Sequence, residues 1–181
     1  APQIMVGYWD RPTETANMIR NGWVDTGDLG YMDQDGYLFI VDRKKDLIKP
    51  SGFQVWPREV EEIIAAYKGV QESTVYGVQV PGADGRAGMA MLVLDDAASF
   101  DWQAFAQYLE GALPSYARPL FVRVGGAIET TGTFKYRKVD LRDAGFDPAR
   151  AGHVRMLRDG TYQELTAAQY ADIVAGAMRV G

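Results

Sequence analysis

The chain has 181 residues, of which 47% are hydrophobic and 24% charged, a composition typical of an ordinary soluble globular protein. The net charge of −5 argues against nonspecific nucleic-acid binding, and no stretch has the roughly 20 apolar residues that span a bilayer. There is no cysteine, which excludes disulfides and thiolate metal sites. The one histidine, His153, is interpreted as an incidental surface residue.

The first residues indicate a chain that continues a larger one. It opens without an initiator methionine, and Val6-Gly7-Tyr8-Trp9 is typical of the end of a strand. We therefore expect a fragment whose larger partner lies upstream. Residues 13–20 then predict a short helix with a threonine cap and Arg20 at its exit.

Two apolar runs, residues 30–32 and 37–41, predict a β-hairpin because an Asp35-Gly36 step lies between them. A calcium-binding loop is the alternative for this turn. It is rejected because the first ligand would be Tyr31 and the last would be Asp42 instead of glutamate.

Four consecutive charged residues, 43–46, interrupt the apolar pattern and predict a short exposed joint between two domains. A small hairpin is expected next, around Pro50-Ser51-Gly52. Strands and helices then alternate, which predicts a compact α+β domain with two helices packed on a small sheet. The expected helices are 57–67, 101–113 and 139–144, and the expected strands are 70–80, 88–94 and 121–124. In the tail, a strand and a helix are expected to dock back on this domain.

Lys135 is the most informative residue. It lies in residues 130–138, a run of small polar residues closed by a basic cluster. Threonines and a glycine let the backbone approach a ligand, and one ammonium on a flexible stem can reach a developing negative charge on a phosphate or carboxylate. A surface turn with solvated lysines is the alternative, and this motif alone favours that alternative.

A second polar group occurs much earlier in the chain. Asp28 follows Gly27 at the mouth of a strand pair, where a carboxylate can accept two hydrogen bonds from a ribose diol. Arg43 follows at the next strand end and offers a cation for phosphate or ribose oxygens. A solvated turn aspartate would explain Asp28 alone. With Lys135, these residues predict a nucleotide site divided between two bodies.

Several ordered motifs resemble the C-terminal part of the adenylate-forming enzymes, the superfamily of acyl-CoA synthetases, coumarate-CoA ligases, luciferases and peptide-synthetase adenylation domains. Thr26-Gly27-Asp28 resembles the ribose motif, and residues 113–119 resemble the L-P-x-Y-x-x-P stretch. Residues 42–49 and 52–61 resemble the hinge motif in its coumarate-ligase and luciferase form. The resemblance covers residues 1–145.

Further segments are similar to the fatty acid transport proteins and very-long-chain acyl-CoA synthetases. They are residues 84–89, 116–119, 131–135, 145–148 and 159–162. Two features depart from this subgroup or from the superfamily. The hinge has the coumarate-ligase form, and Phe134 precedes Lys135 where most of the superfamily has glycine.

The resemblance implies an α+β fold, the small C-terminal lid domain of the superfamily, preceded by a β-hairpin segment from the large N-terminal domain. Residues 1–42 would end that ATP-binding domain, and residues 43–46 would form a hinge that rotates at Lys45. Residues 47–145 would form the mobile C-terminal domain, and residues 146–181 a C-terminal extension.

The implied activity is that of an AMP-forming acid–thiol ligase that uses ATP, Mg²⁺ and coenzyme A. A fatty acid or related carboxylate would attack the α-phosphate of ATP, and Lys135 with Mg²⁺ would spread the developing charge. Asp28 and Arg43 would hold the ribose.

A rotation would then withdraw Lys135 for the second half-reaction. The Ser51-Gly52 turn would admit the thiol of coenzyme A, because a glycine allows close passage. Lys49 and Gln54 match positions that assist in coumarate ligases, with structural roles as the alternative. Three other cations, Lys44, Arg137 and Lys138, are interpreted as solvated, with a coenzyme A phosphate contact as the alternative for Lys138.

The resemblance also implies a cytoplasmic enzyme that binds no nucleic acid, with peripheral membrane association left open. Two rival functions remain. The chain would be a noncatalytic module that binds a partner, or part of a ligase that transfers the acyl group to a carrier-protein thiol. Because the acyl pocket and phosphate loop would lie upstream, we expect the 181-residue chain alone to lack acyl-CoA synthetase activity.

Overall fold

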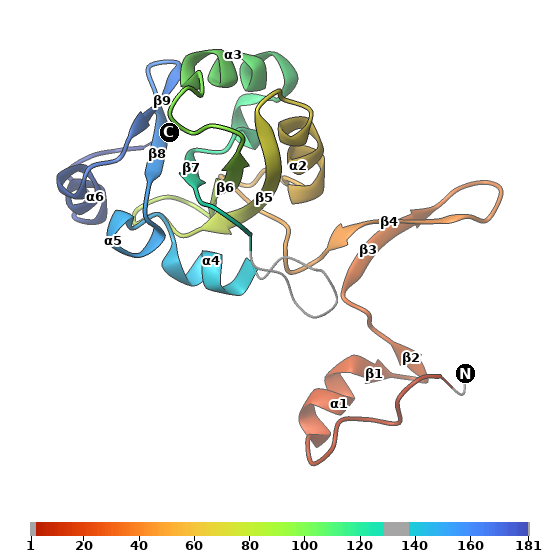
Figure 1. The fold of residues 1–181 in the computed structure, drawn as a ribbon. Coiled ribbons are helices and arrows are strands. Elements are labelled where there is room, and N and C mark those ends of the chain that lie inside the picture. The colour runs from red at the N-terminus through yellow and green to blue at the C-terminus, as the bar shows by residue number, and fades with distance from the viewer. Residues whose placement is uncertain (1–2, 129–137, 181) are drawn as a thin grey trace. The chain divides into compact units, whose positions relative to one another are not determined.

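The computed structural model describes residues 3–128 and 138–180 (Figure 1). The chain divides into two compact units, Ala1–Lys45 and Asp46–Gly181. The division falls within the four charged residues that interrupt the apolar pattern.

The first unit contains one helix and two small antiparallel sheets. Helix α1 spans Pro12–Met18, and strand β1 (Ile19–Arg20) pairs with β2 (Trp23–Val24). The predicted helix at 13–20 is therefore present but shorter. Its predicted threonine cap is wrong, because the N-cap residue is Arg11, whose side chain makes no capping bond. Pro12 begins the helix, where its missing N–H costs nothing.

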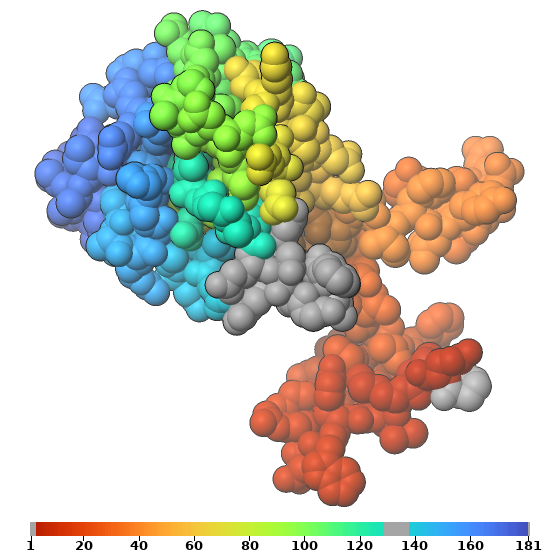
Figure 2. Space-filling view, viewed as in Figure 1, coloured from red at the N-terminus to blue at the C-terminus, as the bar shows by residue number. Residues whose placement is uncertain are grey.

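The predicted hairpin is confirmed as β3 (Asp28–Met32) paired with β4 (Leu38–Arg43). Asp33 organises its turn, because Oδ1 accepts hydrogen bonds from the backbone N–H groups of Asp35 at 3.0 Å and Tyr37 at 2.9 Å. Gly36 has φ of 87°, a left-handed conformation that glycine adopts readily. The space-filling view shows this hairpin in orange (Figure 2).

The second unit is built on a five-stranded sheet with strand order β5-β6-β7-β8-β9, in which β6 and β7 are parallel and the other pairs antiparallel. The strands are β5 (Val70–Val78), β6 (Ala87–Leu94), β7 (Phe121–Val124), β8 (Val154–Arg158) and β9 (Thr161–Glu164). The helices are α2 (Pro57–Ala65), α3 (Trp102–Ala112), α4 (Lys138–Ala144), α5 (Pro148–Ala151) and α6 (Ala167–Val174), with a 3₁₀ turn at Ser115–Ala117.

Alternating side chains of the sheet pack into two separate hydrophobic cores, one on each face. On β6, Ala90 and Leu92 pack into a cluster with residues of α2 and α3, whereas Met89 and Met91 pack into a second cluster with residues of α4, α5 and α6. The sheet is therefore covered on both faces, which explains why β6 carries no polar side chain along its length. The prediction of two helices on a small sheet described only one of these faces.

The tail contributes two strands where one was expected. Strands β8 and β9 join the same sheet, so residues 146–181 belong to the same compact unit as the residues before them. The turn between the strands places Asp159 at φ of 51° and Gly160 at φ of 75°. This Asp-Gly step is the same hairpin signal as at Asp35-Gly36, and it could have identified the second strand.

Candidate functional site

The loop before β3 sets the orientation of Asp28. The backbone N–H of Gly27 donates to Oδ1 of Asp25 at 2.8 Å, and that of Asp28 donates to Oγ1 of Thr26 at 3.2 Å. Gly27 has φ of 70°, so it takes the tight turn without strain. Asp28 is the first residue of β3, and its backbone N–H already has a hydrogen-bond partner in Thr26.

Asp28 and Arg43 lie opposite each other across β3 and β4. Arg43 Nε is 3.3 Å from Oδ1 of Asp28, and the side chains are 47% and 29% exposed respectively. The structure thus brings together two of the predicted nucleotide-binding residues. Because a guanidinium has several donors and a carboxylate several acceptor positions, both groups keep capacity for another partner.

An open pocket of about 640 Å³ adjoins the same loop. Its lining includes Thr26, Gly27, Tyr8, Asn17 and Met18. Its volume lies in the range of small-molecule sites, and its lining combines apolar with polar groups. The first unit therefore offers a concave surface beside the loop that carries Asp28.

The predicted turn of the second unit is present as a tight hairpin. Ile48 and Val55 are buried and exchange both backbone hydrogen bonds. Lys49 and Gln54, one residue further along each arm, are exposed. The predicted Lys49, Gln54, Ser51 and Gly52 therefore lie on one short hairpin.

The tip of this hairpin has an unusual backbone, with φ of 45° at Ser51 and 84° at Gly52. A Cβ added to Gly52 would meet nothing within 4 Å. Both residues are exposed, so the tip presents main chain with little side-chain cover.

The loop that contains Gly85 is hydrogen-bonded to the hairpin of residues 48–55. The backbone N–H of Ser51 donates to the carbonyl of Asp84 at 3.1 Å, and that of Arg86 donates to the carbonyl of Lys49 at 3.2 Å. A Cβ on Gly85 would lie 1.8 Å from the Lys49 carbonyl oxygen. Only glycine therefore permits this approach, and the position of the hairpin depends on it.

Lys45, the predicted hinge residue, is the last residue of the first unit. Asp46 begins the second unit, and its Oδ1 lies 2.5 Å from Nη2 of Arg142 on α4. The side chains are 15% and 20% exposed, so the pair is largely removed from water. The first residue after Lys45 is thereby tied to the body of the second unit.

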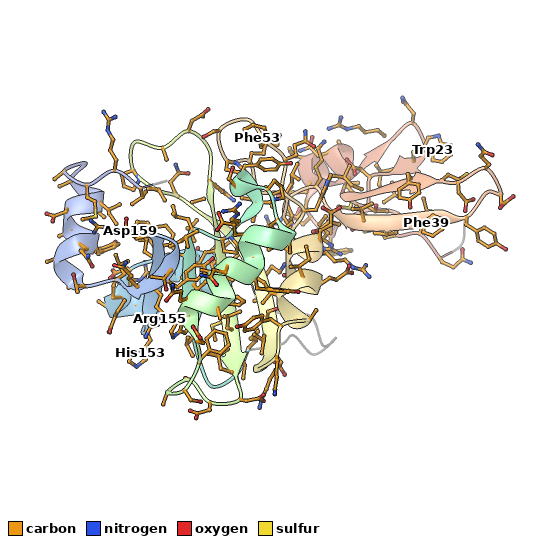
Figure 3. All side chains as sticks on the ribbon, turned by 90° about the horizontal axis from the view of Figure 1, so that it is seen from above. Trp23, Phe39, Phe53, His153, Arg155 and Asp159 are labelled. Atoms are coloured by element: carbon orange, nitrogen blue, oxygen red, sulfur yellow. The ribbon has the colours of Figure 1, made fainter. Side chains whose placement is uncertain are left out.

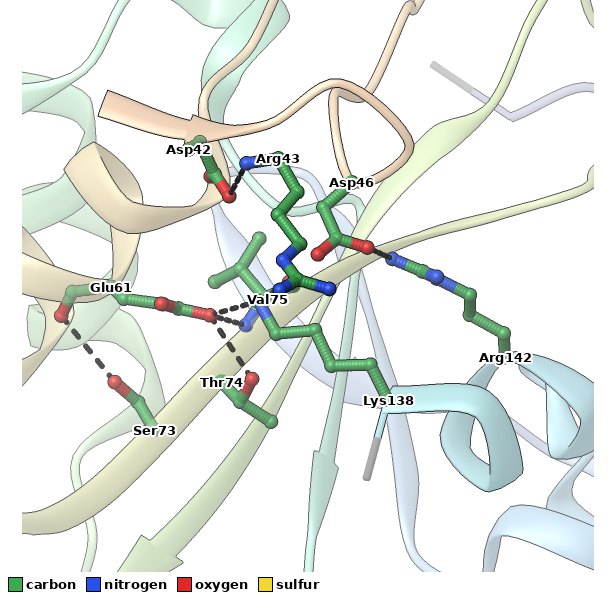
Figure 4. Close-up of polar contacts among 9 residues, drawn as sticks. All are labelled: Asp42, Arg43, Asp46, Glu61, Ser73, Thr74, Val75, Lys138 and Arg142. Carbon is green, nitrogen blue, oxygen red and sulfur yellow. Dashed lines mark hydrogen bonds and ion pairs between the residues drawn. The ribbon is translucent and has the colours of Figure 1, made fainter. Parts of the chain in front are cut away.

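Lys135, the predicted catalytic residue, lies outside the described residues. Of the residues that flank its segment, Ile128 is buried and Lys138 is the first residue of α4. Lys138 Nζ lies 2.7 Å from Oε1 of Glu61 and 3.0 Å from the carbonyl oxygen of Val75 (Figure 4). The interpretation of Lys138 as a solvated charge is therefore wrong.

Sequence reasoning missed an exposed aromatic pair beside the hairpin. The rings of Phe53 and Tyr116 stack with centroids 4.4 Å apart and planes 7° from parallel. Phe53, labelled in Figure 3, is 51% exposed, so one ring face remains available. Because the two residues are far apart in sequence, no local pattern could have identified the stack. His153 is exposed, as predicted.

Two buried tyrosines have perturbed acidities. Burial raises the pKa of Tyr76 to about 12, an effect that the nearby charge of Arg123 opposes. Burial also raises the pKa of Tyr162, whose hydroxyl donates to the carbonyl oxygen of Pro119 at 2.7 Å. Both rings are almost fully buried in the two cores, so these shifts concern stability.

Within residues 3–128 and 138–180, no group of three or more histidine or acidic side chains is arranged to hold a metal ion. In the same ranges, no helix has the length and apolar character needed to cross a membrane.

Residues 59–135 match the family model described as the AMP-binding enzyme C-terminal domain. The chain is 40% identical over 159 residues to long-chain fatty acid transport protein 3 of Homo sapiens, a match covering 86% of this chain and 23% of the relative. It is 42% identical over 146 residues to the medium/long-chain-fatty-acid–CoA ligase FadD6 of Mycobacterium tuberculosis, covering 77% and 24%.

Among solved structures, the chain is similar to ATP-bound MatB from Rhodopseudomonas palustris, with a TM-score of 0.73 and 35% identity. That similarity covers 79% of this chain and 28% of the other. The chain thus spans about a quarter of the length of the curated relatives it matches.

Proposed function

Because residues 59–135 belong to the AMP-binding enzyme C-terminal domain family, we propose that the chain is the C-terminal portion of an ATP-dependent fatty acyl-CoA ligase. One observation carries the proposal. The 159 residues matched to a fatty acid transport protein exceed the length of the second unit, so the similarity includes both units. In the proposed enzyme, residues 1–42 end an N-terminal ATP-binding domain and residues 43–46 form the hinge.

Asp28 and Arg43 hold the ribose of ATP in this proposal. Their separation of 3.3 Å supports the assignment, because each group orients the other and both remain partly exposed. The described residues offer no acidic cluster for the Mg²⁺ that accompanies ATP.

Lys135 stabilises the charge that develops when the carboxylate attacks the α-phosphate. The attack forms the acyl–phosphate bond, breaks the bond to pyrophosphate and yields an acyl-adenylate. An ammonium that binds the developing charge accelerates the step to the extent that it binds the transition state more tightly than the substrates.

The Ser51-Gly52 tip serves the second half-reaction, after rotation at Lys45. The thiol of coenzyme A attacks the acyl carbonyl, the thioester forms and AMP leaves. An exposed tip with little side-chain cover suits the passage of the narrow pantetheine arm. Lys49 and Gln54, exposed on the same hairpin, are proposed to assist.

The proposal is tested in the full-length polypeptide that carries this chain, with Lys135→Ala compared to Lys68→Ala, a change at an exposed lysine of the second unit. Pyrophosphate release from ATP and fatty acid measures adenylation, and coenzyme A added to synthetic acyl-adenylate measures thioester formation. We expect Lys135→Ala to lose adenylation and retain thioester formation, with Lys68→Ala unchanged in both. Retention of both half-reactions in Lys135→Ala would refute the assignment.

The acceptor is tested by competition between coenzyme A and a carrier-protein thiol for the same acyl-adenylate. Product on coenzyme A is expected, whereas preferential loading of the carrier protein would establish the alternative. The 181-residue chain alone is expected to form no acyl-CoA. Measurable acyl-CoA from it would contradict the proposal that the acyl pocket and phosphate loop lie in the upstream part of the enzyme.

A further inference from the structure

Glu61 on α2 collects hydrogen-bond donors from two other elements (Figure 4). Its Oε1 accepts from the backbone N–H of Val75 at 2.7 Å, from Oγ1 of Thr74 at 3.0 Å and from Nζ of Lys138 at 2.7 Å. Lys138 Nζ also donates to the Val75 carbonyl oxygen at 3.0 Å. One carboxylate therefore joins α2, β5 and the first residue of α4.

The pair is largely withdrawn from water, with Lys138 17% and Glu61 21% exposed. A charge in this environment depends on its partner much more than a surface charge does. Lys138 is also the first residue of α4, where the helix dipole disfavours a cation. The carboxylate of Glu61, 2.7 Å from Lys138 Nζ, offsets that effect.

Lys138 is separated from Lys135 by only two residues in the sequence. We propose that Glu61 is a positioning residue for the adenylation half-reaction. By holding Lys138, it fixes the described residue that follows Lys135 most closely in the chain. This inference rests on the proposed function. Glu61 touches no reacting atom in this scheme and acts only through Lys138.

The experiment uses Glu61→Gln in the full-length polypeptide. Glutamine keeps an acceptor oxygen for Val75 and Thr74 but removes the charge that holds Lys138. We expect adenylation to fall on the order of 10- to 100-fold, because small misplacements of a reacting group have effects of this size. Thioester formation from synthetic acyl-adenylate should remain near the unmodified rate, since Lys135 is withdrawn in that step.

Glu62→Gln is the matched control. Glu62 is the next residue on α2 and pairs with Arg58 on the surface, where the two side chains are 67% and 64% exposed. The Glu62→Gln variant loses one negative charge, as Glu61→Gln does, and the rates of both half-reactions should be unchanged. Lys138→Met, which removes the cation and keeps the chain length, should reproduce the selective loss of adenylation.

A third comparison separates positioning from general destabilisation. The residual adenylation rate of Lys135→Ala should not fall further when Glu61→Gln is added, because the effect of Glu61 passes through Lys135. An equal loss of both half-reactions in Glu61→Gln and Lys138→Met, or a further loss in the Lys135→Ala background, would overturn the inference.

The two hypotheses fail differently. If Lys135→Ala retains adenylation, the proposed function is refuted. If Lys135→Ala loses adenylation while Glu61→Gln retains it, only the role of Glu61 is refuted.

Discussion

Asp28 and Arg43 face each other at the ends of β3 and β4, with Arg43 Nε 3.3 Å from Oδ1 of Asp28. The pair is half-exposed, so its electrostatic attraction contributes little to stability by itself. The partial exposure of both side chains and their capacity for further hydrogen bonds point instead to a binding role.

Asp28→Asn in the full-length polypeptide is therefore expected to raise KM for ATP about tenfold, because a charge-assisted hydrogen bond to a ribose hydroxyl becomes a neutral one. Asp35→Asn, at the exposed tip of the same hairpin, is the control and should leave KM unchanged. Steady-state kinetics with varied ATP measure both. A KM that is equal in the two variants would contradict the role of Asp28.

Arg142→Met should destabilise the second unit by on the order of 2 kcal/mol, because Asp46 is left largely buried without its cation. Urea unfolding of the 181-residue chain measures the loss. Arg158→Met is the control, since Arg158 pairs with Asp159 on the surface and should have an effect near zero. The double variant Asp46→Asn/Arg142→Met should be less destabilised than the sum of the single variants.

Gly85→Ala should displace the hairpin that carries Ser51 and Gly52, because its Cβ would lie 1.8 Å from the Lys49 carbonyl oxygen. Gly82→Ala is a matched control, since its φ of 76° is close to the 79° of Gly85 but a Cβ there meets nothing within 4 Å. Both changes carry the backbone strain of a left-handed residue, about 1 kcal/mol.

Thioester formation from synthetic acyl-adenylate should therefore fall in Gly85→Ala and stay near normal in Gly82→Ala. Equal rates in the two variants would show that the hairpin position is unimportant for this half-reaction.

The free energy of unfolding should decrease as pH rises above about 10. Tyr76 has its pKa raised by burial from 10.0 to about 12, so between these values the unfolded chain binds fewer protons than the folded protein. The stability that this group provides is complete below pH 10.0 and is lost as pH rises through about 12. The slope is about 1.4 kcal/mol per pH unit for each such tyrosine.

Tyr76→Phe keeps the buried ring and removes this titration, so its unfolding free energy should fall less steeply above pH 10.0. Urea unfolding at a series of alkaline pH values measures the slope. Parallel slopes for the variant and the unmodified chain would be inconsistent with a protonated, buried phenol at position 76.

Local patterns predicted most of the fold because they depend on short-range chemistry. The Asp35-Gly36 step, the apolar spacing of α2 and α3 and the apolar runs of β5 to β7 all gave elements at the expected places. The β8–β9 hairpin was missed although its Asp159-Gly160 step is a local signal, whereas the pairing of β8 with β7 joins segments about 30 residues apart and has no local signal.

The residues of the candidate site likewise fall into those that the sequence could identify and those that it could not. The residue types at Asp28, Arg43 and the Ser51-Gly52 tip could be recognised from their motifs, because glycine and charge at fixed spacing have a direct chemical meaning. The role of Glu61 could not, since its carboxylate meets Val75 and Lys138 only after α2, β5 and α4 have packed together.

The amino-acid sequence by itself determined most of the helices, strands and turns, and which residue types are suited to bind a nucleotide. Only the tertiary structure decided that Lys138 is a paired, largely buried charge and that Gly85 supports the hairpin at Lys49. The physical reason is the separation in sequence between the residues that interact. Turn geometry and apolar periodicity act over a few residues, whereas the burial of an ion pair or the close approach of two backbones depends on segments that meet only in the folded chain.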